Sequence, residues 1–349
     1  MKNFKLLLLI TSFAVFFASC DDDNNSPAPE VTLEGTLLIN AGGFGQANGS
    51  LSLYDESTGT LDSKVFSAAN GRELAASIES VTVQDTMTLI MCYAPDKVEF
   101  AHTSTLKSLN TPTTDVVNPR YASIHGDYAY VTCWGPYEAD FSLQNSYVAK
   151  IDLRTFEKVD EIPVGSGPEG IITIDDQIFV AVSNTQEIAV IDPATAEVIK
   201  TIPLEVAPQH LSSDNQGTLW CTLSSYSANS TGLQAIDLNE LTATDFYALE
   251  AGINYEGHLS TDESGNTLYV LGNDGGVYSF DTEAKTYSTS SIIAADPSIY
   301  GFGVNPMTAF IYTSDAAGFQ GNGSIKVYDE TGTLTDEEVV GVAPFRFVF

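Results

Sequence analysis

Basic residues are scarce in this sequence. Its 349 residues include 14 lysines and arginines against 46 aspartates and glutamates, which gives a formal net charge of −32 at pH 7. A surface with this charge repels the phosphate backbone of DNA and RNA, and no basic stretch interleaved with aromatic residues is present to overcome the repulsion. The sequence therefore predicts that nucleic acid is not a partner.

Cysteine is also scarce, with four residues in the chain, and no cysteine pair has the spacing of a zinc site. Cys92, Cys133 and Cys221 each lie inside an apolar, strand-like run. Three cysteines cannot all pair with one another, and apolar surroundings suit a thiol that packs as a small hydrophobic side chain. We expect these three cysteines to be buried and unpaired.

The N-terminus has a short hydrophobic run, which is not long enough to span a bilayer. Two lysines precede the apolar residues 6–17, and small residues then lead to Cys20. This pattern is typical of a secretory signal peptide. The four residues "FASC" at 17–20 resemble the lipobox of bacterial lipoproteins, although Phe17 stands where leucine is commonest. An ordinary cleaved signal peptide is the alternative.

The lipobox resemblance implies a division of the N-terminal region. Residues 1–19 would be the lipoprotein signal peptide, and Cys20 would become the lipidated first residue. Residues 20–33, rich in Asp, Asn and Pro, would form an acidic flexible tether. The run "CDDDNN" resembles the signal that sends some Gram-negative lipoproteins to the outer face of the outer membrane, although it is also compatible with a merely solvated start. We therefore expect a cell-surface protein that contacts the membrane through its lipid anchor alone.

The rest of the chain repeats one pattern: a strand-like run, an aspartate, three to five turn residues and a second strand-like run. An aspartate suits this position because it accepts hydrogen bonds from backbone N–H groups two residues on, so we expect a structural role for it. The pattern occurs seven times, once in a degenerate form with histidine. The marker residues are Asp55, His102, Asp152, Asp192, Asp237, Asp281 and Asp329.

A second hairpin lies between successive markers, with two β-rich runs joined by Asp, Asn or Gly. Each unit of about 45 residues therefore holds four strands, which is the repeat of a propeller blade. Only the window 71–80 resembles a helix, and a loop entering an inner strand is an equal interpretation of it. The sequence predicts an all-β fold over residues 34–349, a seven-bladed β-propeller with four-stranded blades.

The two ends of the predicted propeller complement each other. Residues 34–42 form a strand that has no preceding inner partner, whereas residues 343–349 resemble the innermost strand of a blade and then stop. We expect the C-terminal strand to pair with the N-terminal blade, because this pairing removes two open sheet edges.

In a four-stranded blade, the loops between blades and the loops joining the second and third strands lie on one face. Aromatic residues in the second class of loop would form a rim on this face: Phe44, Trp134, Tyr137, Phe141, Tyr226 and Phe319. Polar and aromatic residues near the inner strands would surround the mouth of the channel: Arg120, Tyr121, Glu169, Gln209, His210, Glu256, His258, Tyr300, Phe302 and Arg346. Such an arrangement suits a concave site for a sizeable organic ligand. Alternatively, the aromatic side chains pack on their own blades and the charged ones pair across the channel as structural contacts.

Several segments resemble the YncE-like, YVTN-repeat family of seven-bladed propellers found as surface lipoproteins. They are "LINAGGFGQANGSLSLYD", "AANGRELAASIESVTV", "NPRYASIHGDYAYVT" and "VGSGPEGIITIDDQIFVAVSNTQEIAVIDPATAEVIKTIPL". In that family the BtuG lipoproteins capture cobalamin (vitamin B12) and sit over a TonB-dependent outer-membrane transporter. The resemblance implies capture of a nutrient ligand, cobalamin first, and its transfer to such a transporter.

Other functions stay open at this stage. Aromatic walls with Arg, Gln and Glu would also suit a siderophore or an oligosaccharide, although the acidic surface disfavours strongly anionic ligands. A surface adhesin or scaffold that binds protein or glycan is a second class, and a propeller hydrolase or lactonase using Glu79, Glu169 or Glu256 is a third. His210 and His258 occupy equivalent repeat positions, so a metal pair is conceivable. Because no catalytic motif is present, we predict a protein that is not an enzyme and holds no metal or cofactor.

The lipidation prediction can be tested directly by metabolic labelling. Labelled palmitate is expected to enter the wild-type protein and to be absent from Cys20→Ala, because the acyl groups are attached at that residue alone. Acyl chains bind membranes with about 0.8 kcal/mol per buried CH₂ group, so the variant should also leave the membrane fraction. Equal labelling of both proteins would contradict the prediction.

Overall fold

The structure of the protein is a computed structural model, and it describes residues 34–228 and 230–349. These residues belong to one compact unit, Thr32–Phe349. The predictions for the signal peptide, Cys20 and the tether lie outside the described residues. Within the described ranges no helix is long and apolar enough to cross a membrane.

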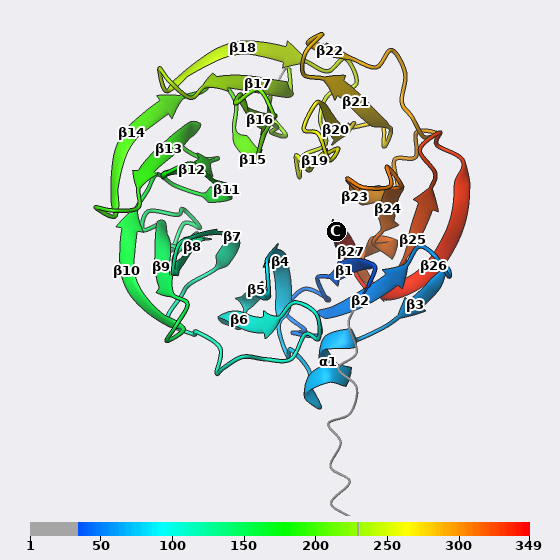
Figure 1. The fold of residues 1–349 in the computed structure, drawn as a ribbon, viewed down its shortest axis with the longest axis horizontal. Coiled ribbons are helices and arrows are strands. Elements are labelled where there is room, and N and C mark those ends of the chain that lie inside the picture. The colour runs from blue at the N-terminus through cyan, green and yellow to red at the C-terminus, as the bar shows by residue number, and fades with distance from the viewer. Residues whose placement is uncertain (1–33, 229) are drawn as a thin grey trace, which may run out of the picture. The chain divides into compact units, whose positions relative to one another are not determined.

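Seven antiparallel sheets follow one another around a ring, with one blade of the propeller to each sheet (Figure 1). The first three blades consist of β27 (Pro344–Val348), β1 (Thr36–Asn40), β2 (Ser50–Asp55) and β3 (Thr60–Asp62); β4 (Ser77–Gln84), β5 (Met87–Ala94) and β6 (Asp96–His102); and β7 (Pro119–His125), β8 (Tyr128–Cys133), β9 (Tyr147–Asp152) and β10 (Glu157–Pro163). The fourth and fifth blades consist of β11 (Pro168–Ile174), β12 (Gln177–Val182), β13 (Glu187–Asp192) and β14 (Glu197–Pro203); and β15 (Pro208–Ser213), β16 (Leu219–Leu223), β17 (Gly232–Asp237) and β18 (Thr242–Ala248). The last two blades consist of β19 (Leu259–Thr261), β20 (Thr267–Leu271), β21 (Val277–Asp281) and β22 (Thr286–Tyr287); and β23 (Ile299–Val304), β24 (Ile311–Asp315), β25 (Asn322–Tyr328) and β26 (Leu334–Val342).

The predicted seven-bladed all-β fold is therefore confirmed, with one local variation in the second blade. Its sheet contains three regular strands, and the outer position is taken by a segment that forms only the isolated bridges Val98↔Thr113 and Ala101↔Ser108. This blade is the one whose repeat has His102 in place of the marker aspartate.

The six marker aspartates hold the turns between the third and fourth strands, as predicted. In each turn the carboxylate accepts a hydrogen bond from the backbone N–H two residues on, at 2.8 or 2.9 Å. These bonds satisfy turn N–H groups that the sheet cannot reach. The aspartates therefore serve the fold, despite their acidity.

Helical structure is confined to two short elements in the described residues, α1 (Val65–Asn70) and the 3₁₀ turn η1 (Ala317–Phe319). The window 71–80 is a loop that leads into β4, so the loop interpretation holds and α1 lies just before it. Helix α1 forms because Val65 and Phe66 are buried against the first blade, and Gly71 ends it with a left-handed backbone (φ 63°).

The hydrophobic core is divided among the interfaces between neighbouring blades. One cluster, for example, packs Tyr130 and Val148 of the third blade against Ile178 and Val180 of the fourth. Because each blade buries its faces against its two neighbours, the ring is stable only as a whole. Cys92, Cys133 and Cys221 are buried and free, as predicted.

The ring closes through the predicted pairing of the two ends of the propeller. Strand β27 pairs antiparallel with β1, with Leu37 opposite Val348 and Ile39 opposite Arg346. In Figure 1 the red β27 and the blue β1 lie in the same blade.

Deletion of residues 343–349 should abolish cooperative folding. The deletion removes the inner strand of the first blade, leaves the edge of β1 unpaired, and takes two phenylalanines out of the cores at both faces of that blade. Each lost phenylalanine costs about 3–5 kcal/mol, which together approaches the whole stability of a typical domain. Thermal unfolding followed by circular dichroism measures the effect, and a truncated protein with the wild-type melting temperature would refute this account of closure.

Candidate functional site

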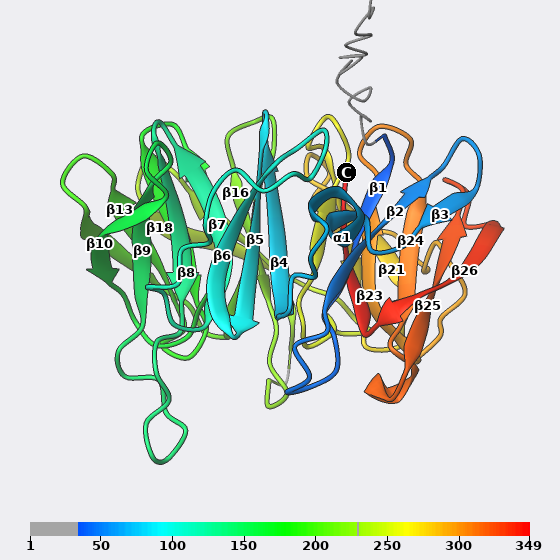
Figure 2. The same ribbon diagram turned by 90° about the horizontal axis from the view of Figure 1, so that it is seen from below.

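The long connections of the propeller project from one face. They join the second and third strands of the blades, after β1, β8, β16 and β24, and they reach the lower edge of Figure 2. We call this face the loop face. The connections from the outermost strand of one blade to the innermost strand of the next end on the same side, which agrees with the prediction from the repeats.

A bulge at the start of the inner strands brings consecutive side chains into the channel. In β7 the pairing jumps from Pro119↔Cys133 to Ala122↔Val131, so that Arg120 and Tyr121 together face one residue of β8. The inner strands β11, β15 and β23 show the same irregularity. Because a bulge leaves one residue outside the alternation of a strand, two neighbouring side chains point to the same side.

Threonines on the second strands support these bulges. The hydroxyl of Thr132 accepts from Tyr121 N at 3.0 Å and lies 2.9 Å from the carbonyl of Glu169 in the next blade. Thr222 has the same two roles toward His210 N and the carbonyl of Gly257. These hydroxyls satisfy backbone groups that the ladder leaves free, and they tie adjacent inner strands together.

A cavity of about 240 Å³ lies at the loop-face end of the channel, and we call it the central chamber. Eight of the predicted site residues line it: Arg120, Tyr121, Trp134, Glu169, Gln209, His210, Glu256 and Tyr300. They come from five blades or blade connections, so the propeller does gather these scattered positions into one concavity.

Two arginines and two glutamates form a buried charge cluster at the chamber. Arg120 donates to Glu79 at 2.5 Å and to Glu169 at 3.1 Å, and its guanidinium lies 4.0 Å from the centre of the Trp134 ring. Arg346 donates to the hydroxyl of Tyr121 and lies 4.0 Å from Glu79. The pairing across the channel that the structural alternative predicted is therefore present.

The carboxylates of the chamber are not all held in their charged form. Burial is the main cause that raises the pKa of Glu169, to about 7, and the nearby charge of Glu79 adds to it against the opposing effect of Arg120. Burial also raises the pKa of Glu256. For Arg120, burial opposes the charge, but the attraction of Glu169 and Glu79 outweighs it and raises the pKa. Glu169 can therefore take up or release a proton near neutral pH.

The two predicted histidines lie next to each other, with ring centres 5.6 Å apart. His210 lines the chamber and bonds through Nε2 to the carbonyl of Glu256 at 3.1 Å. His258 is deeper, buried beside Phe302 and Phe345, and neither of its ring nitrogens has a hydrogen-bond partner among the described residues. Burial lowers the pKa of both histidines well below the ordinary value, and Arg346 adds to this effect.

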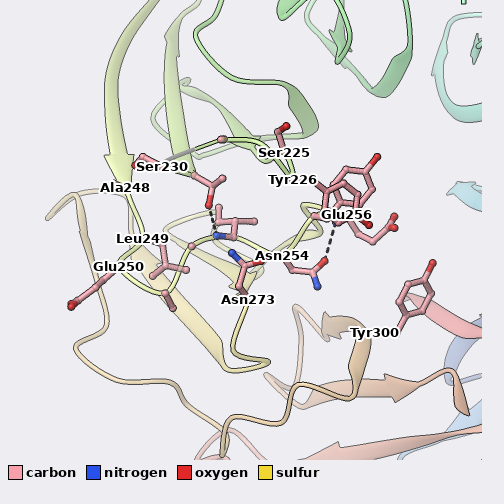
Figure 3. A pocket seen from close by; sticks show the side chains of 16 residues that line it. Ser225, Tyr226, Ser230, Ala248, Leu249, Glu250, Asn254, Glu256, Asn273 and Tyr300 are labelled. Atoms are coloured by element: carbon pink, nitrogen blue, oxygen red, sulfur yellow. Dashed lines mark hydrogen bonds between the residues drawn. The ribbon is translucent and has the colours of Figure 1, made fainter. Parts of the chain in front are cut away.

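A second cavity, of about 660 Å³, adjoins the chamber between the fifth and sixth blades, and we call it the lateral pocket (Figure 3). It shares Tyr255, Glu256 and Tyr300 with the central chamber. The ring of Tyr226 stacks on that of Tyr255 with centres 3.7 Å apart and planes at 16°. The two cavities are therefore neighbours on the loop face, and these three residues line both of them.

The rim residues predicted from the loops are exposed. Phe44, Phe141 and Tyr226 have 93%, 81% and 84% of their surface accessible, and Tyr137 and Phe319 are about half exposed. Tyr137 contacts both Trp134 and Phe141 edge to face, so the loop after β8 carries a small aromatic cluster of its own. Four of these rim residues line neither cavity: Phe44, Tyr137, Phe141 and Phe319.

Phe302 was predicted at the mouth of the channel but lies in the core. It is 3% exposed and packs in the core of the last two blades, because the bulge in β23 turns Tyr300 into the channel and the following alternation sends Phe302 into the blade. His258 and Arg346 also lie outside the lining of the chamber, although His258 contacts the ring of His210 and Arg346 contacts Tyr121, both of which line it.

Several residues that line the chamber were missed by the sequence analysis: Ala41, Ile78, Tyr93, Tyr255 and Phe345. Glu79, which the sequence suggested only for a hydrolase, lines it as well. For two of the missed residues the sequence did contain an indication, namely their position next to a predicted site residue. Tyr255 directly precedes Glu256 in the connection that enters the sixth blade, and Phe345 precedes Arg346. Because bulges place two consecutive residues in the channel, neighbours of predicted residues were the positions to examine.

The sequence matches, over residues 34–340, the family described as "Domain of unknown function (DUF5074)". The chain belongs to this family. No curated protein matches it.

Solved structures of other proteins resemble the propeller of this DUF5074 member. A quinonprotein alcohol dehydrogenase-like protein from Bacteroides thetaiotaomicron shares 15% identity with a TM-score of 0.68, covering 89% of this chain and 77% of that one. The periplasmic gluconolactonase PpgL of Pseudomonas aeruginosa shares 16% identity with a TM-score of 0.65, covering 90% and 99%. AztD of Citrobacter koseri shares 17% identity with a TM-score of 0.57, covering 91% and 88%. Likeness at this level of identity concerns the fold alone.

The described residues contain no group of three or more His, Cys, Asp or Glu side chains able to hold a metal ion. In particular, the pair formed by His210 and His258 lacks a third ligand of these types. A metal would need at least three such protein ligands in most sites of this kind.

His258→Leu is expected to raise the melting temperature, and to raise it more at pH 5 than at pH 7. An unpaired buried polar group costs about 1–3 kcal/mol, and leucine fits an apolar environment of this size. The folded protein keeps His258 neutral while the unfolded chain binds a proton below about pH 6.5, so the wild type loses stability as the pH falls below that value.

Thermal unfolding of both proteins at the two pH values measures this effect. Other titrating groups, including Glu169 with its opposite pH dependence, contribute equally to both proteins and cancel in the difference. A difference in melting temperature that shrinks between pH 7 and pH 5 would contradict this assignment.

Proposed function

We propose that this protein captures a large organic ligand at its loop face, with cobalamin as the leading candidate. The observation that carries the proposal is the pair of adjacent cavities on the loop face, the central chamber and the lateral pocket. Their combined volume lies within the range of known ligand sites, about 300–1,000 Å³. Trp134 lines the chamber and the exposed Tyr226 lines the lateral pocket, so both cavities offer aromatic surface to a ligand.

The chemistry of the chamber supports a ligand with both flat and polar parts. Cobalamin has a corrin face and arms that carry amides. Trp134 in the chamber wall offers aromatic surface to the first, with Tyr137 in edge-to-face contact behind it, and the side chains of Gln209 and Tyr300 offer hydrogen bonds to the second. Such combinations of apolar walls with a few placed polar groups fix the orientation of a bound molecule.

The charges of the site also favour a ligand without strong negative charge. Arg120 is already shared between Glu79 and Glu169, so it has little unbalanced charge to offer an anion. The surrounding protein is strongly acidic and repels anions over longer distances. A neutral or weakly charged ligand needs no free cation in the site and is not repelled by the acidic surface.

We further propose that the propeller is held at the cell surface by lipid on Cys20 and passes its ligand to a TonB-dependent transporter in the outer membrane. Support for this part comes from the sequence: the lipobox-like "FASC", the acidic run after it, and the resemblance to surface lipoproteins. A lipid anchor on a tether with the composition of residues 20–33, which is typical of a flexible linker, would keep the loop face within reach of a membrane protein.

Spectral titration with cyanocobalamin tests the ligand, since this molecule carries its own chromophore. The wild type is expected to bind it, and Trp134→Ala/Tyr137→Ala is expected to bind at least about tenfold more weakly, as is common when aromatic anchors are truncated. Met307→Ala is the matched control, because Met307 is 70% exposed but lies in the turn between β23 and β24, away from the loop face.

A wild-type protein that gives neither a spectral change nor heat on addition of cyanocobalamin would remove cobalamin from the proposal. Equal binding by the wild type and the double variant would show that the aromatic loop after β8 does not contact the ligand.

A further inference from the structure

The lateral pocket has a composition of its own, which differs from that of the central chamber. Its described lining contains the acids Glu250 and Glu256, several hydroxyl and amide side chains, and no lysine, arginine or histidine. The chamber, in contrast, contains Arg120 and His210. An anionic group entering the lateral pocket would therefore meet only negative charge and neutral dipoles, whereas a group rich in hydrogen-bond donors would find acceptors.

A flat aromatic surface forms one wall of the lateral pocket. Tyr255 lines both cavities and covers one face of Tyr226, whereas Tyr226 lines the lateral pocket alone and is 84% exposed. The second face of the Tyr226 ring is therefore free. The face of an aromatic ring carries partial negative charge, and the C–H groups of a sugar ring, polarised by their oxygens, are attracted to it.

Free acceptors lie at the same end of the pocket as this surface. Glu256 makes neither a side-chain hydrogen bond nor an ion pair with any of the described residues, although it is half-buried. Figure 3 draws Glu256 near Tyr226, with the hydroxyl of Tyr300 across the opening. A buried carboxylate without a donor is costly, and sugar hydroxyls are donors that can satisfy it.

The floor of the pocket adds fixed polar groups. The hydroxyl of Thr231 accepts from Ile253 N at 2.6 Å, and Asn254 accepts through Oδ1 from Glu256 N at 2.9 Å, both drawn in Figure 3. The second bond holds the connection that carries Glu256 and leaves the Asn254 amide N–H₂ free of protein partners in the described residues. Asn273 is likewise free to donate and accept. These groups complement the mixed donors and acceptors of a polyol.

We infer that the lateral pocket binds a neutral sugar ring, stacked on Tyr226 and hydrogen-bonded to Glu256, as a unit of an oligosaccharide. This site is distinct from the central chamber and does not depend on cobalamin as its ligand. It would let the propeller hold a glycan beside, or as part of, the molecule that it captures.

Isothermal titration calorimetry with maltohexaose, cellohexaose, xylohexaose and mannohexaose tests the inference on the purified full chain. At least one of these neutral oligosaccharides is expected to bind. Tyr226→Ala should weaken that binding at least about tenfold, while Tyr226→Phe should retain it within about twofold, because the ring and not the hydroxyl provides the contact. Glu256→Gln should also weaken it, because a neutral amide is a poorer acceptor than a carboxylate.

Phe141→Ala is the matched control, since Phe141 is an equally exposed aromatic residue in another loop and lies outside the pocket. Binding of none of the four oligosaccharides would overturn the inference, and so would equal loss in Phe141→Ala and Tyr226→Ala. Binding of spermidine alone, lost in Glu256→Gln, would identify a cation site and would also overturn it. Cyanocobalamin titrated into the same wild-type protein reports on the proposed function separately, so the two failures are distinguishable.

Discussion

The pairing of β27 with β1 is the contact on which the rest of the structure depends. It completes the first blade, and through that blade it closes the ring in which every core is shared by two neighbours. The same strand brings Phe345 to the wall of the chamber and Arg346 to Tyr121. Stability and the site are therefore coupled, because an open ring would lack both a sealed core and part of the channel lining.

The electrostatics of the channel follow from how many charges it buries. Arg120 and Arg346 face Glu79, Glu169 and Glu256, so the carboxyl groups outnumber the guanidinium groups. The pKa of Glu169, raised by burial to about 7, reduces this imbalance, because part of its negative charge is protonated near neutral pH. Ion pairs therefore fix the positions of the charged side chains in the chamber. The chamber has little net charge, although the whole protein is strongly acidic.

The sequence predicted the architecture well because the relevant signals are local and repeated. Each marker aspartate bonds within its own turn, so the sequence pattern and the hydrogen bond report the same thing. The end of the chain was equally informative, since residues 343–349 look like an inner strand without the rest of a blade. Helix α1 was not predicted, because its six residues show no periodic pattern and the helix is stabilised by the burial of Val65 and Phe66.

The site was predicted less completely, and the reason is again physical. Simple alternation along an inner strand sends every second side chain into the channel, but the bulges break this rule at the mouth. Phe302 was therefore assigned to the mouth and is in the core, whereas Tyr255 and Phe345 were left out and line the chamber. Bulges depend on pairing between strands, and a single sequence does not display that pairing.

The separation between the two closing strands has a consequence for how the protein is made. Strand β1 is synthesised about three hundred residues before its partner Arg346 exists, and contacts of such long range form slowly. During that interval β1 presents a bare edge to other chains, and an unpaired edge of this kind favours misassembly before the last strand arrives.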